Sequence, residues 1–263
     1  MGREERIGEV VVVVHEDARV ATVEMCRPPN NFFNVALIRG VASAYERLDD
    51  DDDVRVIVLC SEGKHFSAGA DFSRRDRTPE ESADEGNLYH EALRLFRADK
   101  PVVAAVQGAA VGGGLGLACS ADFRVATERT RFVANFAKLG LHHGFGLTVS
   151  LPAVIGAQKA SDLLLTGRPV RGEEALEIGL CDRLAETEDG LRTVAHELAA
   201  DIATSGPLAL EAIRRTMRGD LGDRVEAALA VEQREQTRLG ATEDFQEGVR
   251  ATAERRPANF RRR

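Results

Sequence analysis

The sequence KPVVAAVQGAAVGGGLG, residues 100–116, joins an apolar run to a glycine-rich turn. The run Pro101–Val106 has no charged side chain, which is typical of a strand buried on both faces of a parallel sheet. Five glycines follow within Gly108–Gly116, and the apolar pattern then continues as a helix through Ser120. This order of strand, turn and helix predicts an α/β fold.

A second glycine-containing turn, GKHFSAGAD at residues 63–71, follows the apolar run Val54–Cys60. Both turns are expected at the carboxyl ends of neighbouring parallel strands, where open α/β sheets bind their ligands. Glycine lets a ligand approach the backbone closely, and the first amides of a helix are free to bind an anion or a developing oxyanion. Composition alone leaves tight packing as an equal alternative.

The remaining sequence divides into a mixed part and a helical part. The first 125 residues alternate, with predicted strands Glu9–His15 and Arg19–Cys26, helices Asn34–Leu48 and Asn87–Ala98, and a loop Phe72–Gly86. After about residue 140 every predicted element is a helix: Gly144–Ile155, Ala157–Leu165, Gly172–Ile178, Leu191–Ser205, Pro207–Arg218, Asp223–Leu239 and Thr242–Glu254.

We therefore predict an α/β core over residues 1–200 and a helical region over residues 201–263. The apolar stripe Val225, Leu229 and Val231 in the helical region needs a partner surface. This stripe predicts that residues 201–263 make the chain a homo-oligomer.

The charge and the cysteine content exclude several classes of protein. The 263 residues include 43 acidic and 35 basic ones, for a net charge of −8, so the chain is not expected to bind nucleic acid. The apolar runs are too short to span a membrane. The charged start Met1–Arg6 does not resemble a secretory signal, and the four cysteines have no metal-ligand spacing. A soluble, cytoplasmic protein with no bound metal is expected.

A dinucleotide site is the obvious alternative use of the glycines, but the spacing does not fit. A GxGxxG motif that begins at Gly112 or Gly114 requires a glycine where the chain has Leu117 or Cys119. A nucleotide-dependent oxidoreductase is therefore disfavoured.

Both turns, in this order, resemble the two oxyanion-hole segments of the crotonase superfamily, the enoyl-CoA hydratase/isomerase family. The resemblance covers essentially the whole chain and includes ADFRVA at 121–126 and LTGRPVRGEEALEIGL at 165–180. It implies a spiral of ββα units followed by a helical trimerisation region, in a trimer or a dimer of trimers. It also implies an acyl-CoA thioester as substrate, with no cofactor beyond the coenzyme A of that substrate.

The resemblance also implies roles for individual residues. The backbone amides of Ala70 and Gly113 correspond to the two donors that stabilise the enolate-like oxyanion of the thioester. Further residues correspond to those that contact the coenzyme A: Arg27, Ala68, Ala70, Asp71, Phe72 and Gly113.

The sequence departs from the hydratase pattern at both catalytic glutamates. By residue matching, these positions hold Gly116 and Phe136, and neither side chain can transfer a proton. Some superfamily members carry an acidic residue near this part of the sequence, and His143 is the residue that best matches its position. A histidine can serve as an acid or a base near neutral pH. We therefore expect an acyl-CoA enzyme that is not a simple hydratase, with His143 in the catalytic set. The alternative is a non-catalytic acyl-CoA carrier or sensor.

Overall fold

A computed structural model describes residues 2–71 and 87–263. Its larger sheet has seven strands in the order β1-β2-β3-β4-β5-β7-β10. The strands β1 to β3 are antiparallel to one another, and every pairing from β3 to β10 is parallel. Their bounds are Arg3–Ile7, Val10–His15, Val20–Met25, Val56–Ser61, Val102–Ala105, Phe123–Thr127 and Arg183–Ala185.

A second sheet contains three short strands in the order β6-β8-β9, with bounds Ala109–Val111, Arg131–Val133 and Pro169–Arg171. The sequence does not predict these strands, because three residues are too few to establish an alternating pattern. The strand β1 was also missed. Its sequence, REERI, is charged, and an edge strand with exposed side chains accommodates such residues.

The predicted helices are present. Their bounds are α1 Val35–Asp49, α3 Leu88–Phe96, α4 Gly113–Ser120, α5 Leu147–Ile155, α6 Ala157–Thr166, α7 Gly172–Glu177, α8 Leu191–Ala203, α9 Pro207–Arg218, α10 Leu221–Gly240 and α11 Glu243–Ala253. Helix α5 begins three residues later than predicted, since Phe145 and Gly146 have positive φ angles of 62° and 74°. The predicted loop Phe72–Gly86 lies outside the described residues.

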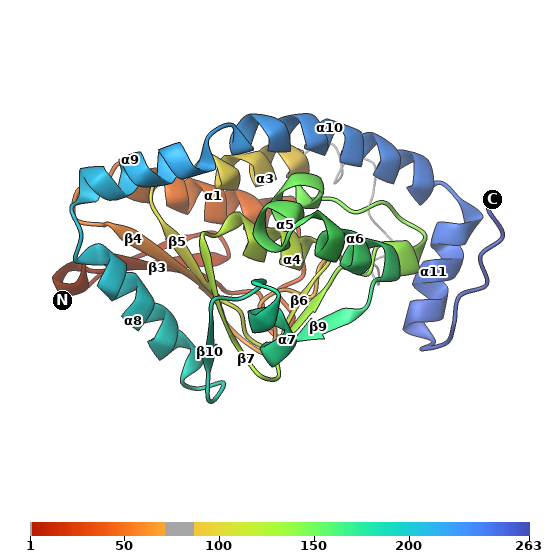
Figure 1. Ribbon diagram of the computed structural model, residues 1–263, viewed down its shortest axis with the longest axis horizontal. Coiled ribbons are helices and arrows are strands. Elements are labelled where there is room, and N and C mark those ends of the chain that lie inside the picture. Colours follow the sequence, from red (N-terminus) through yellow and green to blue (C-terminus); the bar gives the residue numbers. More distant parts are fainter. Residues whose placement is uncertain (1, 72–86) are drawn as a thin grey trace.

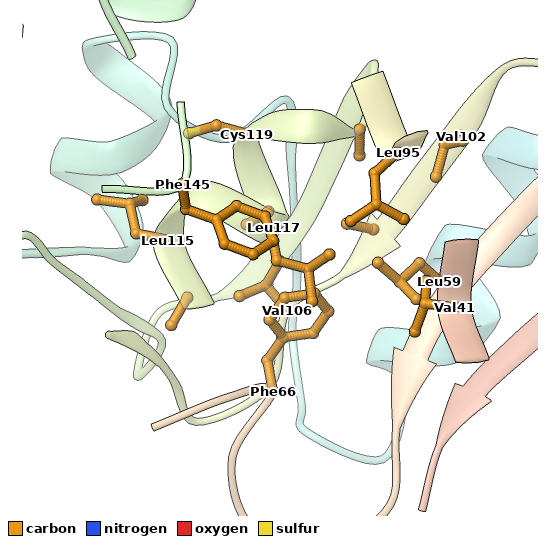
Figure 2. Packing of buried hydrophobic residues seen from close by; sticks show 14 of the residues in the cluster. Val41, Leu59, Phe66, Leu95, Val102, Val106, Leu115, Leu117, Cys119 and Phe145 are labelled. Carbon is orange, nitrogen blue, oxygen red and sulfur yellow. The ribbon is translucent and has the colours of Figure 1, made fainter. Parts of the chain in front are cut away.

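Helices cover both faces of the larger sheet (Figure 1). Helices α1, α3, α9 and α10 lie on one side and α8 lies on the other. The main core is lined by residues from α1, α3, α4 and α5, and Figure 2 shows Phe66, Leu117 and Phe145 among its side chains. Of the described helices, none is long and apolar enough to cross a membrane.

The apolar stripe of α10 is covered by the chain itself, which corrects one step of the sequence analysis. Val225 and Leu229 are buried in the main core, and only Val231 of the stripe is exposed. These two side chains therefore need no second subunit. The division of the chain at residue 200 stays a prediction.

Helix α9 is attached to the sheet through a partly buried carboxylate. Asp122 lies just before β7 and accepts hydrogen bonds from Arg214 Nε at 2.8 Å and from Arg218 Nε at 2.9 Å. Its Oδ2 atom also accepts the amide of Val102 at 2.8 Å. Burial raises the pKa of Asp122, but the two arginines and the hydrogen bonds outweigh burial and hold that pKa below its usual range.

Replacement of Asp122 by alanine leaves two guanidinium groups without their carboxylate. We expect Asp122→Ala to lower the free energy of unfolding by about 3–5 kcal/mol at pH 7. Because the folded-state pKa is depressed, this contribution is present above the ordinary aspartate pKa and is lost as the pH falls through the folded-state pKa. Urea unfolding measures the difference. The control is Asp223→Ala. The Asp223 carboxylate pairs with Arg97, but its side chain is 83% exposed, so we expect its removal to lower the free energy of unfolding by less than about 1 kcal/mol. Equal losses in the two variants contradict this account.

Candidate active site

The two glycine-containing turns are hydrogen-bonded to each other as a short parallel ladder. The amide of Phe66 donates to the carbonyl of Gln107 at 2.9 Å, and the amide of Ser67 donates to that of Ala109 at 3.1 Å. The amide of Val111 donates back to the carbonyl of Ser67 at 2.9 Å. The pairing of β4 with β5 thus continues past the ends of both strands, so the two turns have a fixed register.

Glycine is required at two positions where the turns approach each other closely. A Cβ atom on Gly69 would lie 2.7 Å from the carbonyl oxygen of Val111, and Gly69 has a φ of +82°. A Cβ atom on Gly114 would lie 2.5 Å from the carbonyl oxygen of Ser67. Real Cβ atoms do not approach backbone oxygens this closely, so side chains at these two positions would force the turns apart.

The ladder leaves two backbone amides at the same cavity. Phe33 donates to the carbonyl of Gly69 at 2.8 Å and forms a parallel bridge with Ala70, which directs the Ala70 amide to the opposite side. Gly113 is the first residue of α4, so its amide has no acceptor within the helix. Neither amide donates to another of the described residues. Both Ala70 and Gly113 line the cavity, as the sequence analysis requires.

The cavity has a volume of about 860 Å³ and a mainly apolar wall. Within the described part of the chain, Asp71 is the one carboxylate in its lining. Aromatic and aliphatic side chains form most of the wall: Phe32, Phe33, Val35, Leu88, Val111, Phe136, Leu139, Leu141, Phe145 and Val249. A cavity of this size and polarity is typical of a site for an organic ligand.

Gly116 lies beneath the wall of the cavity and is covered by Phe145. A Cβ atom on Gly116 would lie 2.7 Å from Cβ and 2.9 Å from Cδ1 of Phe145. The Phe145 ring also packs against Phe33, with the ring centroids 5.1 Å apart. An aromatic side chain therefore fills the space into which a longer side chain at residue 116 would extend. Phe136, the second predicted departure, does line the cavity.

His143 lies behind Phe136, with the ring centroids 6.5 Å apart and the rings edge to face. The Thr148 hydroxyl donates its proton to Glu232 Oε1 at 2.6 Å. Its oxygen also lies 2.8 Å from Nε2 of His143 and can only accept there. The hydrogen bond between His143 and Thr148 therefore uses a proton on Nε2. Burial, and then the neighbouring charge of His142, lowers the pKa of His143 to about 4. The imidazole is therefore neutral at physiological pH, and burial is the main cause. His143 is not among the lining residues, and its catalytic role stays a prediction.

The predicted coenzyme A contacts divide into three groups. Ala68, Ala70, Asp71 and Gly113 line the cavity. Arg27 does not line the cavity, but its loop is linked to the first turn through the side chain of Asn31. Asn31 accepts a hydrogen bond from the Arg27 amide at 3.0 Å and donates one to the carbonyl of His65 at 2.7 Å. Phe72 lies outside the described residues.

The structure also adds residues that the sequence analysis did not assign to the site. Gln236 of α10 and Val249, Thr252 and Ala253 of α11 line the cavity, so the helical region closes the site of its own chain. Tyr89 of α3 was not missed in this way: its place on the predicted helix Asn87–Ala98 makes it a candidate for the acyl pocket, and it does line the cavity, where its hydroxyl contacts Gln236. Helical periodicity marked α10 and α11 as helices, but no sequence signal indicated where they return to the core.

Comparisons with known proteins agree with this geometry. A family model described as enoyl-CoA hydratase/isomerase matches residues 15–263. An enoyl-CoA hydratase of Mycobacterium tuberculosis is 33% identical over 257 residues, which cover 95% of this chain and 96% of that protein. A crotonyl-CoA hydratase of Syntrophomonas wolfei is 31% identical over 253 residues, or 95% and 97% of the two chains. The crystal structure of an enoyl-CoA hydratase/isomerase from Pseudoalteromonas atlantica has a TM-score of 0.83 at 29% identity, with 96% of this chain and 100% of that chain covered.

Proposed function

The chain belongs to the enoyl-CoA hydratase/isomerase family and has the crotonase fold, and from this premise we propose that it binds an acyl-CoA thioester and stabilises an enolate-like oxyanion. The observation that carries the proposal is the pair of amides, Ala70 and Gly113, which lie on two turns in fixed register, line one cavity and donate to none of the described residues. A thioester carbonyl placed between them gains negative charge when a bond beside it breaks or forms. A preorganised donor of this kind contributes about 3 kcal/mol of transition-state stabilisation.

The proposed reaction is not simple hydration. Hydration adds water across the α,β double bond and is best served by two carboxylates that hold the water. The two corresponding positions are Gly116, which Phe145 covers, and Phe136, which presents a ring to the cavity. An apolar surface there disfavours a bound, activated water. Hydrolysis, carbon–carbon cleavage and isomerisation remain the candidate reactions.

His143 is the proposed group for proton transfer. Its neutral imidazole packs edge to face against Phe136 and is held through Thr148 and the buried carboxylate of Glu232. With Nε2 as the donor to Thr148, the other ring nitrogen carries the lone pair that a base requires. Because His143 packs against Phe136 and is not itself among the lining residues, direct proton transfer requires a movement of its side chain into the cavity.

A homo-oligomer, either a trimer or a dimer of trimers, is the proposed assembly. Ile213 and Met217 lie one turn apart on α9 and are 61% and 81% exposed, which is unusual for large apolar side chains of a monomer. We expect light scattering to give a mass of three or six chains. A mass of one chain contradicts this part of the proposal.

The alternative function is a non-catalytic acyl-CoA carrier or sensor. It is favoured by the same observation that disfavours hydration, namely that the two glutamate positions hold Gly116 and Phe136. A carrier binds acyl-CoA and releases it unchanged, so turnover separates it from the enzyme.

The test is a panel of enoyl-, 3-oxo- and 3-hydroxyacyl-CoA esters assayed with the wild type and with His143→Ala. We expect turnover of at least one ester by the wild type and poor hydration of crotonyl-CoA. We expect His143→Ala to lose most of that turnover, by about 10²–10⁴-fold, while it still binds the ester. The matched control is His142→Ala, since its ring stacks on that of His143 at 4.1 Å.

Each proposed feature has its own contrary outcome in this panel. Binding without turnover of any ester contradicts the enzyme and favours the carrier. Crotonyl-CoA hydration with a kcat well above ~10³ s⁻¹ contradicts the assignment of the missing glutamates. Equal turnover in His143→Ala and His142→Ala removes His143 from the mechanism and directs attention to Asp71 and Tyr89.

A further inference from the structure

Tyr89 and Gln236 place a side-chain hydrogen-bonding pair in the mainly apolar wall of the cavity. The Tyr89 hydroxyl lies 2.5 Å from Gln236 Oε1, and Gln236 Nε2 lies 2.9 Å from the carbonyl oxygen of His142. The two side chains meet over Gly144, where a Cβ atom would be 2.9 Å from the hydroxyl and 2.7 Å from Nε2. The neighbouring lining residues Leu88 and Leu141 are apolar.

The direction of both hydrogen bonds follows from the chemistry of the groups. The carbonyl of His142 can only accept, so it must face the amide nitrogen of Gln236, and the amide oxygen must face Tyr89. Tyr89 therefore donates its one proton to Gln236. Burial, and then the negative charge of Glu232, raises the pKa of Tyr89, so the phenol stays protonated. Toward the cavity, the Tyr89 oxygen can therefore accept a hydrogen bond but cannot donate one, because its proton is bonded to Gln236 Oε1.

We propose that this pair selects acyl groups that carry a hydroxyl, which donates its proton to the Tyr89 oxygen; the proposal rests on the proposed binding of acyl-CoA. A carbonyl oxygen at the same place would face the lone pairs of Tyr89. If Tyr89 turned its proton toward that carbonyl, Gln236 Oε1 would lose its donor within a partly buried site, which costs free energy. The pair therefore discriminates in favour of hydroxyacyl groups and against oxoacyl groups of the same length.

The experiment measures dissociation constants by calorimetry for five six-carbon esters. They are hexanoyl-CoA, 3-oxohexanoyl-CoA, both enantiomers of 3-hydroxyhexanoyl-CoA, and 6-hydroxyhexanoyl-CoA. For the wild type we expect at least one hydroxylated ester to bind about 10-fold more tightly than hexanoyl-CoA, as one additional hydrogen bond in a partly buried site allows. The 3-oxo ester should show no such gain.

Two variants locate the effect, and a third is the matched control. We expect Tyr89→Phe to abolish the preference for the hydroxyl, measured as the ratio of the dissociation constants of hexanoyl-CoA and the hydroxylated ester in the same variant. Gln236→Leu removes the acceptor of the Tyr89 proton, so that proton becomes available to a carbonyl and the 3-oxo ester should gain affinity. In the control Tyr45→Phe the lost hydroxyl is buried on α1, outside the lining of the cavity, and the preference should persist.

Three results overturn the proposal. The first is equal affinity of the wild type for all five esters, and the second is a hydroxyl preference that persists in Tyr89→Phe. Either result leaves the proposed function intact because hexanoyl-CoA still binds. The third is the failure of every ester to bind, which overturns the proposed function together with this inference.

Discussion

The geometry of the site depends on how closely two backbone turns approach each other. The ladder between Ser67 and the 109–111 segment fixes their register, and it forms only because Gly69 and Gly114 have no Cβ atom to separate them. The amides of Ala70 and Gly113 are positioned by this ladder rather than by a flexible side chain. Backbone donors that are held in this way need little reorganisation when charge develops on a ligand.

Much of the fold could be predicted from the sequence because its elements have strong periodic patterns. The buried strands, the helix after each turn and the C-terminal helices were expected from apolar spacing, and the family resemblance supplied the architecture. The small sheet escaped prediction since its strands have three residues each. The oligomer argument from Val225 and Leu229 failed for another reason: an apolar stripe shows that a partner exists but not whether that partner is the same chain.

The site was predicted where it depends on local sequence and missed where it depends on tertiary packing. Ala70 and Gly113 lie in recognisable turns, and the structure brings both to the cavity. Tyr89 and Gln236 lie 147 residues apart, and no local pattern indicates that they share a hydrogen bond. Similarly, the sequence indicated that Gly116 lacks a carboxylate, but only the structure shows Phe145 packed over it.

The central claim is that the paired amides polarise a thioester carbonyl, and the infrared carbonyl stretch of bound ¹³C-labelled hexanoyl-CoA tests it most directly. The account predicts a stretch at lower frequency than in water for the wild type. It predicts that Gly69→Ala reduces this shift in frequency, because the new Cβ atom would meet the carbonyl oxygen of Val111. The control Gly156→Ala should keep the larger shift, since Gly156 has a similar positive φ but no atom within 4 Å of a new Cβ. A bound carbonyl with the same frequency as in water would contradict the account.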